Sequence, residues 1–172
     1  SVIIPITGSV IASQIVAIIT TIPACLRERF TTSVRNTVKR ILMNPKREIS
    51  QEKLCEFDAL IAKRASGYPL QYILGEWEFY GLPLHVDNNV LIPRDDTCAV
   101  TALAIRQALF LNSTPRILDL CTGSGCIGLS LAKLGGFSVT LSDLSPRAIH
   151  VSRINRGGLD LEEQVEICHG DL

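Results

Sequence analysis

The apolar residues of this 172-residue chain change their spacing several times, and each change predicts a different element. Between Leu26 and Ile41 they recur at intervals of four and then three, which is the period of one helix face. Asn44-Pro45 would end that helix, because proline cannot continue it. A second helix is predicted over residues 51–65, with Gly67 just beyond its end. Its predicted inward residues are Leu54, Phe57 and Ile61.

From Trp77 onward the spacing shortens to two, which is typical of a half-buried strand. Apolar residues on either side of Gly81 predict the two strands of a β-hairpin, and Asp87-Asn88-Asn89 predicts a turn after it. The helical period returns near Asp95. The residues predicted to face inward from this helix are Val100, Leu103, Ala104 and Ala108.

A strand, a loop, a helix and a second strand are predicted in direct succession after Pro115. The first strand covers Ile117–Leu120, the helix covers Cys126–Leu134, and the second strand ends at Asp143. A third strand is predicted over Val165–Asp171. Strands that alternate with helices indicate a parallel sheet. The predicted fold class is therefore α/β, a partial doubly wound Rossmann-like domain preceded by a small helical domain and a β-hairpin linker.

The loop between the first strand and its helix is rich in glycine. Gly123 and Gly125 permit backbone angles that a side chain disfavours, and they let a ligand approach closely. The N–H groups at the start of the following helix favour negative charge. Asp143, at the carboxyl end of the second strand, is placed to accept two hydrogen bonds from ribose hydroxyls. The pattern predicts an adenosine-containing cofactor.

The acids around the loop bear on the identity of that cofactor. The series Gly123-x-Gly125-x-x-Gly128 also fits the dinucleotide fingerprint, which leaves an NAD-dependent oxidoreductase open. Asp119, however, stands where a carboxylate would repel a pyrophosphate and suit a cationic amino-acid group, and we expect it mainly to orient the loop. Asp171, closing the third strand, suits an adenine amino group. This order of acids favours S-adenosylmethionine, and a tight turn without a ligand is the third interpretation.

The composition argues against several kinds of partner and site. The formal net charge is zero, so no basic excess favours nucleic acid as a partner. The six cysteines form no CxxC pair and have no histidine at zinc spacing, so no metal site is predicted. Scattered, reduced thiols favour a cytoplasmic location. None of the three histidines has a partner that the sequence demonstrates, so no catalytic residue is assigned.

The first 26 residues carry no charge, and Arg27 and Arg29 follow them. That length could span a bilayer. Proline, glycine and hydroxyl residues interrupt the apolar run, however, and a signal peptide would carry its positive charge before it. We therefore expect a buried or irregular segment rather than a membrane span. The chain begins without methionine, and we expect it to be a fragment.

Three motifs farther along the chain resemble one known family. They are residues 69–82 (Pro-Leu-Gln-Tyr-Ile-Leu-Gly-Glu-Trp-Glu-Phe-Tyr-Gly-Leu), residues 90–97 (Val-Leu-Ile-Pro-Arg-Asp-Asp-Thr) and residues 119–126 (Asp-Leu-Cys-Thr-Gly-Ser-Gly-Cys). In order and spacing they resemble the HemK/PrmC family of protein-(glutamine) methyltransferases, which act on peptide-chain release factors. The resemblance runs from about residue 41 to the end. A sister group that modifies a large-subunit ribosomal protein shares the glycine loop, but the two earlier motifs favour the release-factor branch.

The resemblance implies three parts: a helical N-terminal domain over residues 1–68, with residues 1–26 apolar, a β-hairpin linker over 69–92, and the N-terminal half of a methyltransferase domain over 93–172. It implies S-adenosylmethionine as the cofactor and a release factor as the protein substrate, without direct contact with nucleic acid or a membrane. Pro93-Arg94 and Thr97 would border the cleft. The residues that it assigns to the cofactor are Cys121, Thr122, Gly123, Ser124 and Gly125 for the methionine part, Asp143 for the ribose and Asp171 for the adenine.

The chain departs from the family pattern in two ways. The family usually has Glu where this chain has Cys98, and the family's Asn-Pro-Pro-Tyr motif does not occur in the 172 residues. Carbonyl groups of that motif grip the glutamine amide, whose nitrogen is a weak nucleophile, and such positioning can supply about 7–11 kcal/mol. We therefore expect this chain alone to be inactive in methyl transfer. A non-enzymatic remnant that docks a protein partner is the remaining alternative.

Overall fold

The structure, a computed structural model, describes residues 51–111 and 115–170. The chain forms two compact units, residues 1–58 and residues 59–172. Some predictions lie outside the described residues: the helix between residues 26 and 41, its end at Asn44-Pro45, the nature of residues 1–26, and Asp171.

The described helices and strands include each one predicted after residue 50. In chain order they are α3 (Gln51–Ala65), α4 (Leu70–Leu74), β1 (Glu76–Phe79), β2 (Leu82–His85), α5 (Asp95–Leu109), β3 (Arg116–Leu120), α6 (Cys126–Gly135), β4 (Ser138–Asp143), α7 (Pro146–Gly158) and β5 (Val165–His169). The β5 strand ends two residues before Asp171, earlier than predicted.

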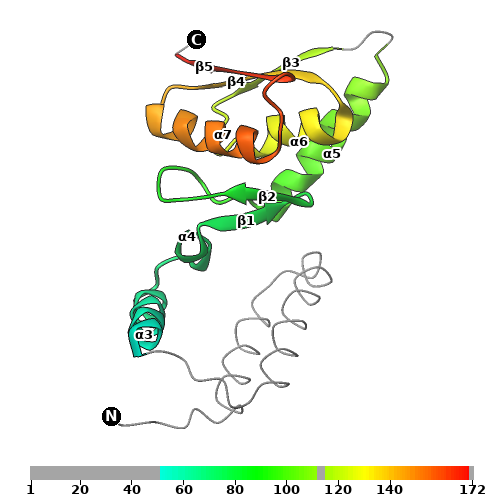
Figure 1. The fold of residues 1–172 in the computed structure, drawn as a ribbon. Coiled ribbons are helices and arrows are strands. Elements are labelled where there is room, and N and C mark those ends of the chain that lie inside the picture. The colour runs from blue at the N-terminus through cyan, green and yellow to red at the C-terminus, as the bar shows by residue number, and fades with distance from the viewer. Residues whose placement is uncertain (1–50, 112–114, 171–172) are drawn as a thin grey trace. The chain divides into compact units, whose positions relative to one another are not determined.

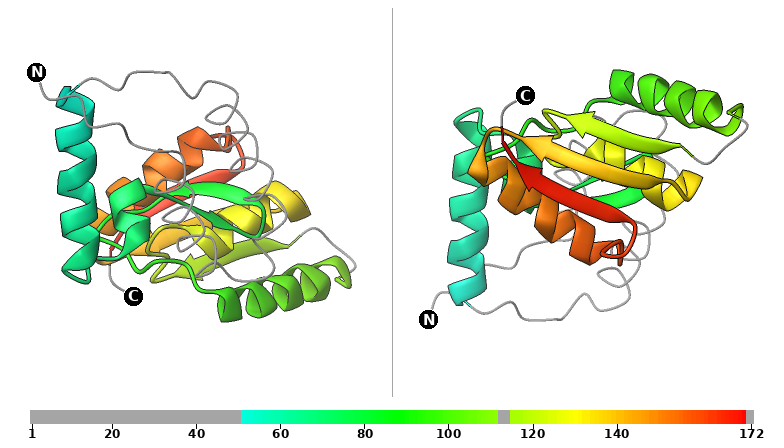
Figure 2. Two further views of the ribbon diagram at one scale, coloured as in Figure 1. Left: turned by 90° about the horizontal axis from the view of Figure 1, so that it is seen from below. Right: turned by 90° about the horizontal axis from the view of Figure 1, so that it is seen from above.

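The strands β3, β4 and β5 form a parallel sheet in that spatial order. Arg116 of β3 pairs with Ser138 of β4, and Val139 of β4 pairs with Val165 of β5, so the carboxyl ends of the strands meet at one edge. Parallel neighbours need crossovers, which α6 and α7 provide. Both helices lie on the same face of the sheet (Figure 1, Figure 2). The predicted α/β, Rossmann-like fold class is confirmed.

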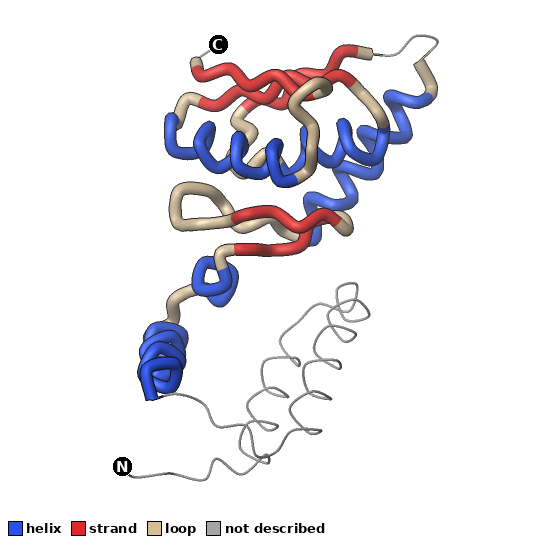
Figure 3. The backbone as a smooth tube through the Cα atoms, in the orientation of Figure 1, coloured by secondary structure: helices blue, strands red, loops and turns tan. Residues whose placement is uncertain are grey.

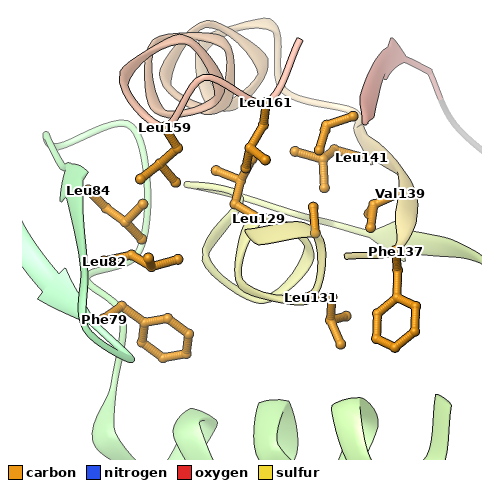
Figure 4. Close-up of a cluster of buried hydrophobic side chains, with 12 residues drawn as sticks. Phe79, Leu82, Leu84, Leu129, Leu131, Phe137, Val139, Leu141, Leu159 and Leu161 are labelled. Carbon is orange, nitrogen blue, oxygen red and sulfur yellow. The ribbon is translucent and has the colours of Figure 1, made fainter. Parts of the chain in front are cut away.

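The antiparallel hairpin of β1 and β2 lies on the side of α6 and α7 that faces away from the sheet (Figure 3). One hydrophobic core connects these layers. Figure 4 shows Leu82 and Leu84 of β2 pointing toward Leu129 of α6, with Leu159 and Leu161 close by. Burying each such leucine contributes about 1.5–3 kcal/mol. The hairpin therefore packs into the same core as the helices of the sheet domain.

The hairpin turn follows from its two central residues. Tyr80 and Gly81 both have positive φ, at 50° and 83°, as a type I′ turn requires. This turn pairs Phe79 directly with Leu82, and it confirms the predicted hairpin. The preceding helix α4 escaped prediction, because five residues make little more than one turn and show no period.

The inward face of α5 is only partly the predicted one. Ala104 and Ala108 pack against the core as predicted, but Val100 and Leu103 are 57% and 47% exposed. Thr101 is fully buried instead, and its hydroxyl donates to a main-chain carbonyl one turn earlier at 3.0 Å. Small side chains and a satisfied hydroxyl allow α5 to approach α6 closely, which the larger apolar residues would not.

The inward face predicted for α3 is wrong at Phe57 and at Ile61. Phe57 and Ile61 are both exposed. Their spacing correctly reports a helical period, but tertiary packing decides which face of a helix is covered. Among residues 51–111 and 115–170, no helix has both the length and the apolar content that crossing a bilayer requires.

Gly128→Ala is expected to destabilise the protein, because a Cβ at this position would collide with Leu141 of β4 and lie 2.9 Å from Oδ2 of Asp119. Overpacking of this kind lowers the free energy of unfolding by about 1–3 kcal/mol. Gly158→Ala, at the end of α7, is the matched control, because its Cβ would meet nothing within 4 Å. We expect it to be neutral or stabilising by up to ~1 kcal/mol. Urea unfolding of both variants measures the difference, and equal stabilities would contradict the packing argument.

Candidate functional site

The glycine loop, residues 121–125, lies at the carboxyl edge of the sheet between β3 and α6. Three of its residues have left-handed backbone angles, with φ of 55° at Cys121, 57° at Gly123 and 83° at Gly125. The two glycines adopt this region freely, whereas Cys121 does so at a steric cost. A Cβ at Gly123 would meet nothing within 4 Å, so there is open space beside that residue. The loop can therefore receive a ligand close to its backbone.

Asp119, the fourth residue of β3, holds the loop in this conformation. Its Oδ2 accepts a hydrogen bond from the Thr122 hydroxyl at 2.7 Å and another from the Gly128 N–H at 2.9 Å. Burial raises the pKa of the Asp119 carboxyl, while these two hydrogen bonds act in the opposite direction and the charge of Asp143 adds to the increase. The prediction that Asp119 orients the loop is confirmed.

Asp143, the last residue of β4, lies beside the same loop. Its Oδ2 accepts from the Gly123 N–H at 2.9 Å, and its Oδ1 accepts from the Ser145 N–H at 2.9 Å. Ser145 caps α7, because its hydroxyl accepts from the Ala148 N–H. Each carboxylate oxygen can accept more than one hydrogen bond. Asp143 thus joins the loop to α7 and keeps capacity for a ligand.

The five loop residues assigned to the cofactor differ in their exposure. Thr122, Ser124 and Gly125 are buried, Gly123 is half-buried, and Cys121 is exposed. The Thr122 hydroxyl is already committed to Asp119. A ligand would therefore meet the loop mainly at Cys121 and Gly123.

The two cysteines that flank the loop differ in their surroundings. Burial is the main cause that raises the pKa of the Cys126 thiol to about 11, so this sulfur stays protonated at neutral pH. Cys121 is exposed and free. Within the described part of the chain, no group of three histidine, cysteine or acidic side chains is placed to hold a metal ion.

The segment that was predicted to border the cleft leads into α5. Arg94 forms an exposed ion pair with Asp96, with 3.8 Å between Nε and Oδ2. Cys98, where the family usually has Glu, packs against the hydrophobic core. The N–H of Gly170 donates to the main-chain carbonyl of Asp143 at 3.3 Å, so the residue that follows β5 lies beside that acid.

Sequence reasoning missed Asn155 on α7. Its side chain is 3% exposed and contacts both the glycine loop and the hairpin: Nδ2 donates to the Ser124 carbonyl at 2.8 Å and to the His85 carbonyl at 3.0 Å. Its Oδ1 accepts from the His85 N–H at 2.6 Å. A signal was available, because Asn155 stands at helical spacing from the apolar Val151 and so occupies an inward position of α7.

A parallel α/β sheet with a glycine loop after its first strand and an acid at the end of its second defines a Rossmann-like nucleotide-binding domain. The family model "Methyltransferase small domain" matches residues 99–172, and that of the "PrmC N-terminal domain" matches residues 34–75. In these two segments the chain is similar to the HemK/PrmC family of methyltransferases.

Several curated relatives carry the name release factor glutamine methyltransferase, among them the following two. The protein of Clostridium acetobutylicum is 44% identical over 133 residues, which are 77% of this chain and 46% of the relative. The protein of Borreliella burgdorferi is 40% identical over 132 residues, which are again 77% of this chain and 46% of the relative. The chain spans about half the length of these relatives.

A solved methyltransferase from Thiobacillus denitrificans, in complex with S-adenosyl-L-homocysteine, is 28% identical over 49% of this chain and 33% of its own, with a TM-score of 0.40.

Asp119→Ala and Asp119→Asn separate the acceptor role of this side chain from its charge. Alanine leaves the Thr122 hydroxyl and the Gly128 N–H without their acceptor, which is expected to lower the free energy of unfolding by about 1–3 kcal/mol or more. Asparagine can place an uncharged oxygen at the same point, so it is expected to retain most of the stability.

The burial of Asp119 also predicts how the stability of the protein depends on pH. Burial raises the pKa of Asp119 above its ordinary value of 3.8, so between the two values the folded state binds more protons than the unfolded state. The free energy of unfolding should therefore fall as the pH rises through that window, and Asp119→Asn should lack this fall. Urea unfolding at a series of pH values compares them, and identical pH profiles would refute the assignment.

Proposed function

We propose that this chain binds S-adenosylmethionine in its glycine loop and serves the methylation of a glutamine side-chain amide in a peptide-chain release factor. The observation that carries the proposal is the hydrogen bond from the Gly123 N–H to the Asp143 carboxylate. The matches to the family models support it. On this proposal, residues 1–68 form the helical domain, 69–92 the hairpin linker and 93–172 the first half of the methyltransferase domain. The reaction belongs to translation termination, so it would take place in the cytoplasm.

The residues around the loop fit this cofactor. Asp143 has acceptor capacity for ribose hydroxyls, and the space beside Gly123 admits the ligand to the loop backbone. Asp119 and Asp143 together give the loop a negative electrostatic environment, which suits a sulfonium cation and opposes the pyrophosphate of NAD. Asp171 is proposed to contact the adenine, and Cys121 to Gly125 the methionine part.

Bound S-adenosylmethionine would supply a methyl group on a positively charged sulfur. The chain's own residues would bind the nucleoside and hold the loop in a fixed conformation, so that the methyl group is presented in a constant position. Asp119 contributes by fixing the loop, and Asp143 by accepting from both the loop and the ribose. No described residue is assigned a proton-transfer role.

Calorimetric titration with S-adenosyl-L-homocysteine tests the cofactor site. We expect the chain to bind it, and Asp143→Ala to bind at least about tenfold more weakly, because hydrogen bonds to a charged acceptor contribute about 1.5–3 kcal/mol. Glu166→Ala, an exposed acid on β5, is the control and should bind normally. Thermal unfolding must show that both variants are folded. Binding of NAD instead of the homocysteine nucleoside would favour the oxidoreductase alternative, and binding of neither would overturn the proposal.

A chimaera tests the substrate. This chain would replace the matching 46% of the Clostridium acetobutylicum relative, and transfer of a labelled methyl group to a release factor would be measured. We expect activity from the chimaera, loss of activity with Asp143→Ala, and none from the 172-residue chain alone. A chimaera that binds the cofactor but methylates a large-subunit ribosomal protein, and not a release factor, would favour the sister group.

A further inference from the structure

Asn155 uses both of its amide N–H groups and its side-chain oxygen to join two segments that lie far from it in the sequence. His85 is 70 residues away and ends β2, while Ser124 is 31 residues away and lies within the glycine loop. One side-chain oxygen and two N–H groups satisfy three main-chain groups at 2.6–3.0 Å. Asn155 therefore serves β2 as a neighbouring strand would, by pairing with both main-chain groups of His85.

The bond to Ser124 acts on the centre of the loop. The peptide unit between Ser124 and Gly125 is held at both ends, because Asn155 donates to its carbonyl and its N–H donates to the Thr122 carbonyl at 2.8 Å. This peptide lies two peptide units after the one that carries the Gly123 N–H, which contacts Asp143. A shift of the Asn155 amide would therefore move the loop backbone two peptide units from the contact with the proposed ribose ligand.

The surroundings of these bonds exclude water as a replacement. Asn155 is 3% exposed, Ser124 is buried, and the residues on either side of His85, Leu84 and Val86, are fully buried. Buried polar groups that lose their partner carry the full desolvation cost, about 1–3 kcal/mol each. The amide of Asn155 is thus a rigid link rather than an exchangeable surface contact.

We propose that Asn155 is a positioning residue that couples the β1–β2 hairpin to the cofactor loop, so that a ligand bound at the loop also stabilises the end of β2. The proposal rests on the proposed function, because it takes the loop as the cofactor site. Its consequence is that hairpin and loop open together. Occupancy of the cofactor site is transmitted to the segment that follows β2 and leads to Pro93-Arg94, which the family resemblance places at the border of the cleft.

Hydrogen exchange of the 172-residue chain with and without S-adenosyl-L-homocysteine tests the coupling. In the wild type, ligand is expected to slow exchange of the His85 amide as well as that of Gly123. In Asn155→Ala, the slowing at His85 should disappear while that at Gly123 persists, and the affinity should fall about tenfold, which corresponds to about 1.4 kcal/mol.

Ser152→Ala is the matched control on the same helix. Ser152 is fully buried and its hydroxyl donates to the Ile149 carbonyl at 3.0 Å, so the substitution removes a hydrogen bond within α7 and keeps those that join the loop and the hairpin. It should keep both the affinity and the slowing at His85. The coupling is refuted if Ser152→Ala loses the affinity and the slowed exchange at His85 as Asn155→Ala does. It is also refuted if Asn155→Ala keeps the slowed exchange at His85. A wild type that shows slowing at Gly123 but none at His85 refutes it without any variant.

A ligand-free arm separates this proposal from the function. Without ligand, Asn155→Ala should speed exchange of the Gly125 amide, whose peptide Asn155 holds, by more than its loss of global stability explains, and Ser152→Ala should not. If the wild type binds no homocysteine nucleoside but this result holds, the cofactor assignment fails while the positioning role stands. If both variants affect Gly125 equally, the positioning role fails.

Discussion

One oxygen of the half-buried Asp119, Oδ2, accepts from the loop through Thr122 and from the first turn of α6 through Gly128. This shared acceptor fixes where the strand ends and how the helix begins, so the position of every loop residue depends on it. The absence of a side chain at Gly128 lets the helix approach the strand closely enough for the bond to form. Burying a carboxylate is unfavourable, and the two donors offset that cost.

Two further side chains extend this arrangement outward. Asp143 joins the loop to the start of α7, and Asn155 joins the loop to the end of the hairpin. The apolar core between the helices and the hairpin supplies most of the cohesion, since it is non-directional and large. The polar side chains add direction, because each hydrogen bond tolerates only a narrow range of geometry. The hydrogen bonds therefore fix the position of the loop, which the apolar core alone would leave free to shift.

The sequence was sufficient to predict those elements whose backbone geometry depends on the residue type itself. Alternating apolar residues predicted the strands of the hairpin, and Gly81, Gly123 and Gly125 marked positions of positive φ. It was insufficient where the partner lies far along the chain. Thr101 is buried in place of larger apolar neighbours because its hydroxyl is satisfied locally, and the partners of Asn155 lie 31 and 70 residues away, beyond the reach of any periodicity.

Cys121 holds a left-handed backbone angle that costs an ordinary L-residue about 1–2 kcal/mol. Glycine would remove this strain, but it would also give the denatured chain more conformational freedom, at a cost of about 0.5–1 kcal/mol. The two contributions oppose each other, and the strain is the larger by roughly 0.5–1 kcal/mol. Glycine would therefore fold slightly more stably here, so that the exposed sulfur is kept at a small cost in stability.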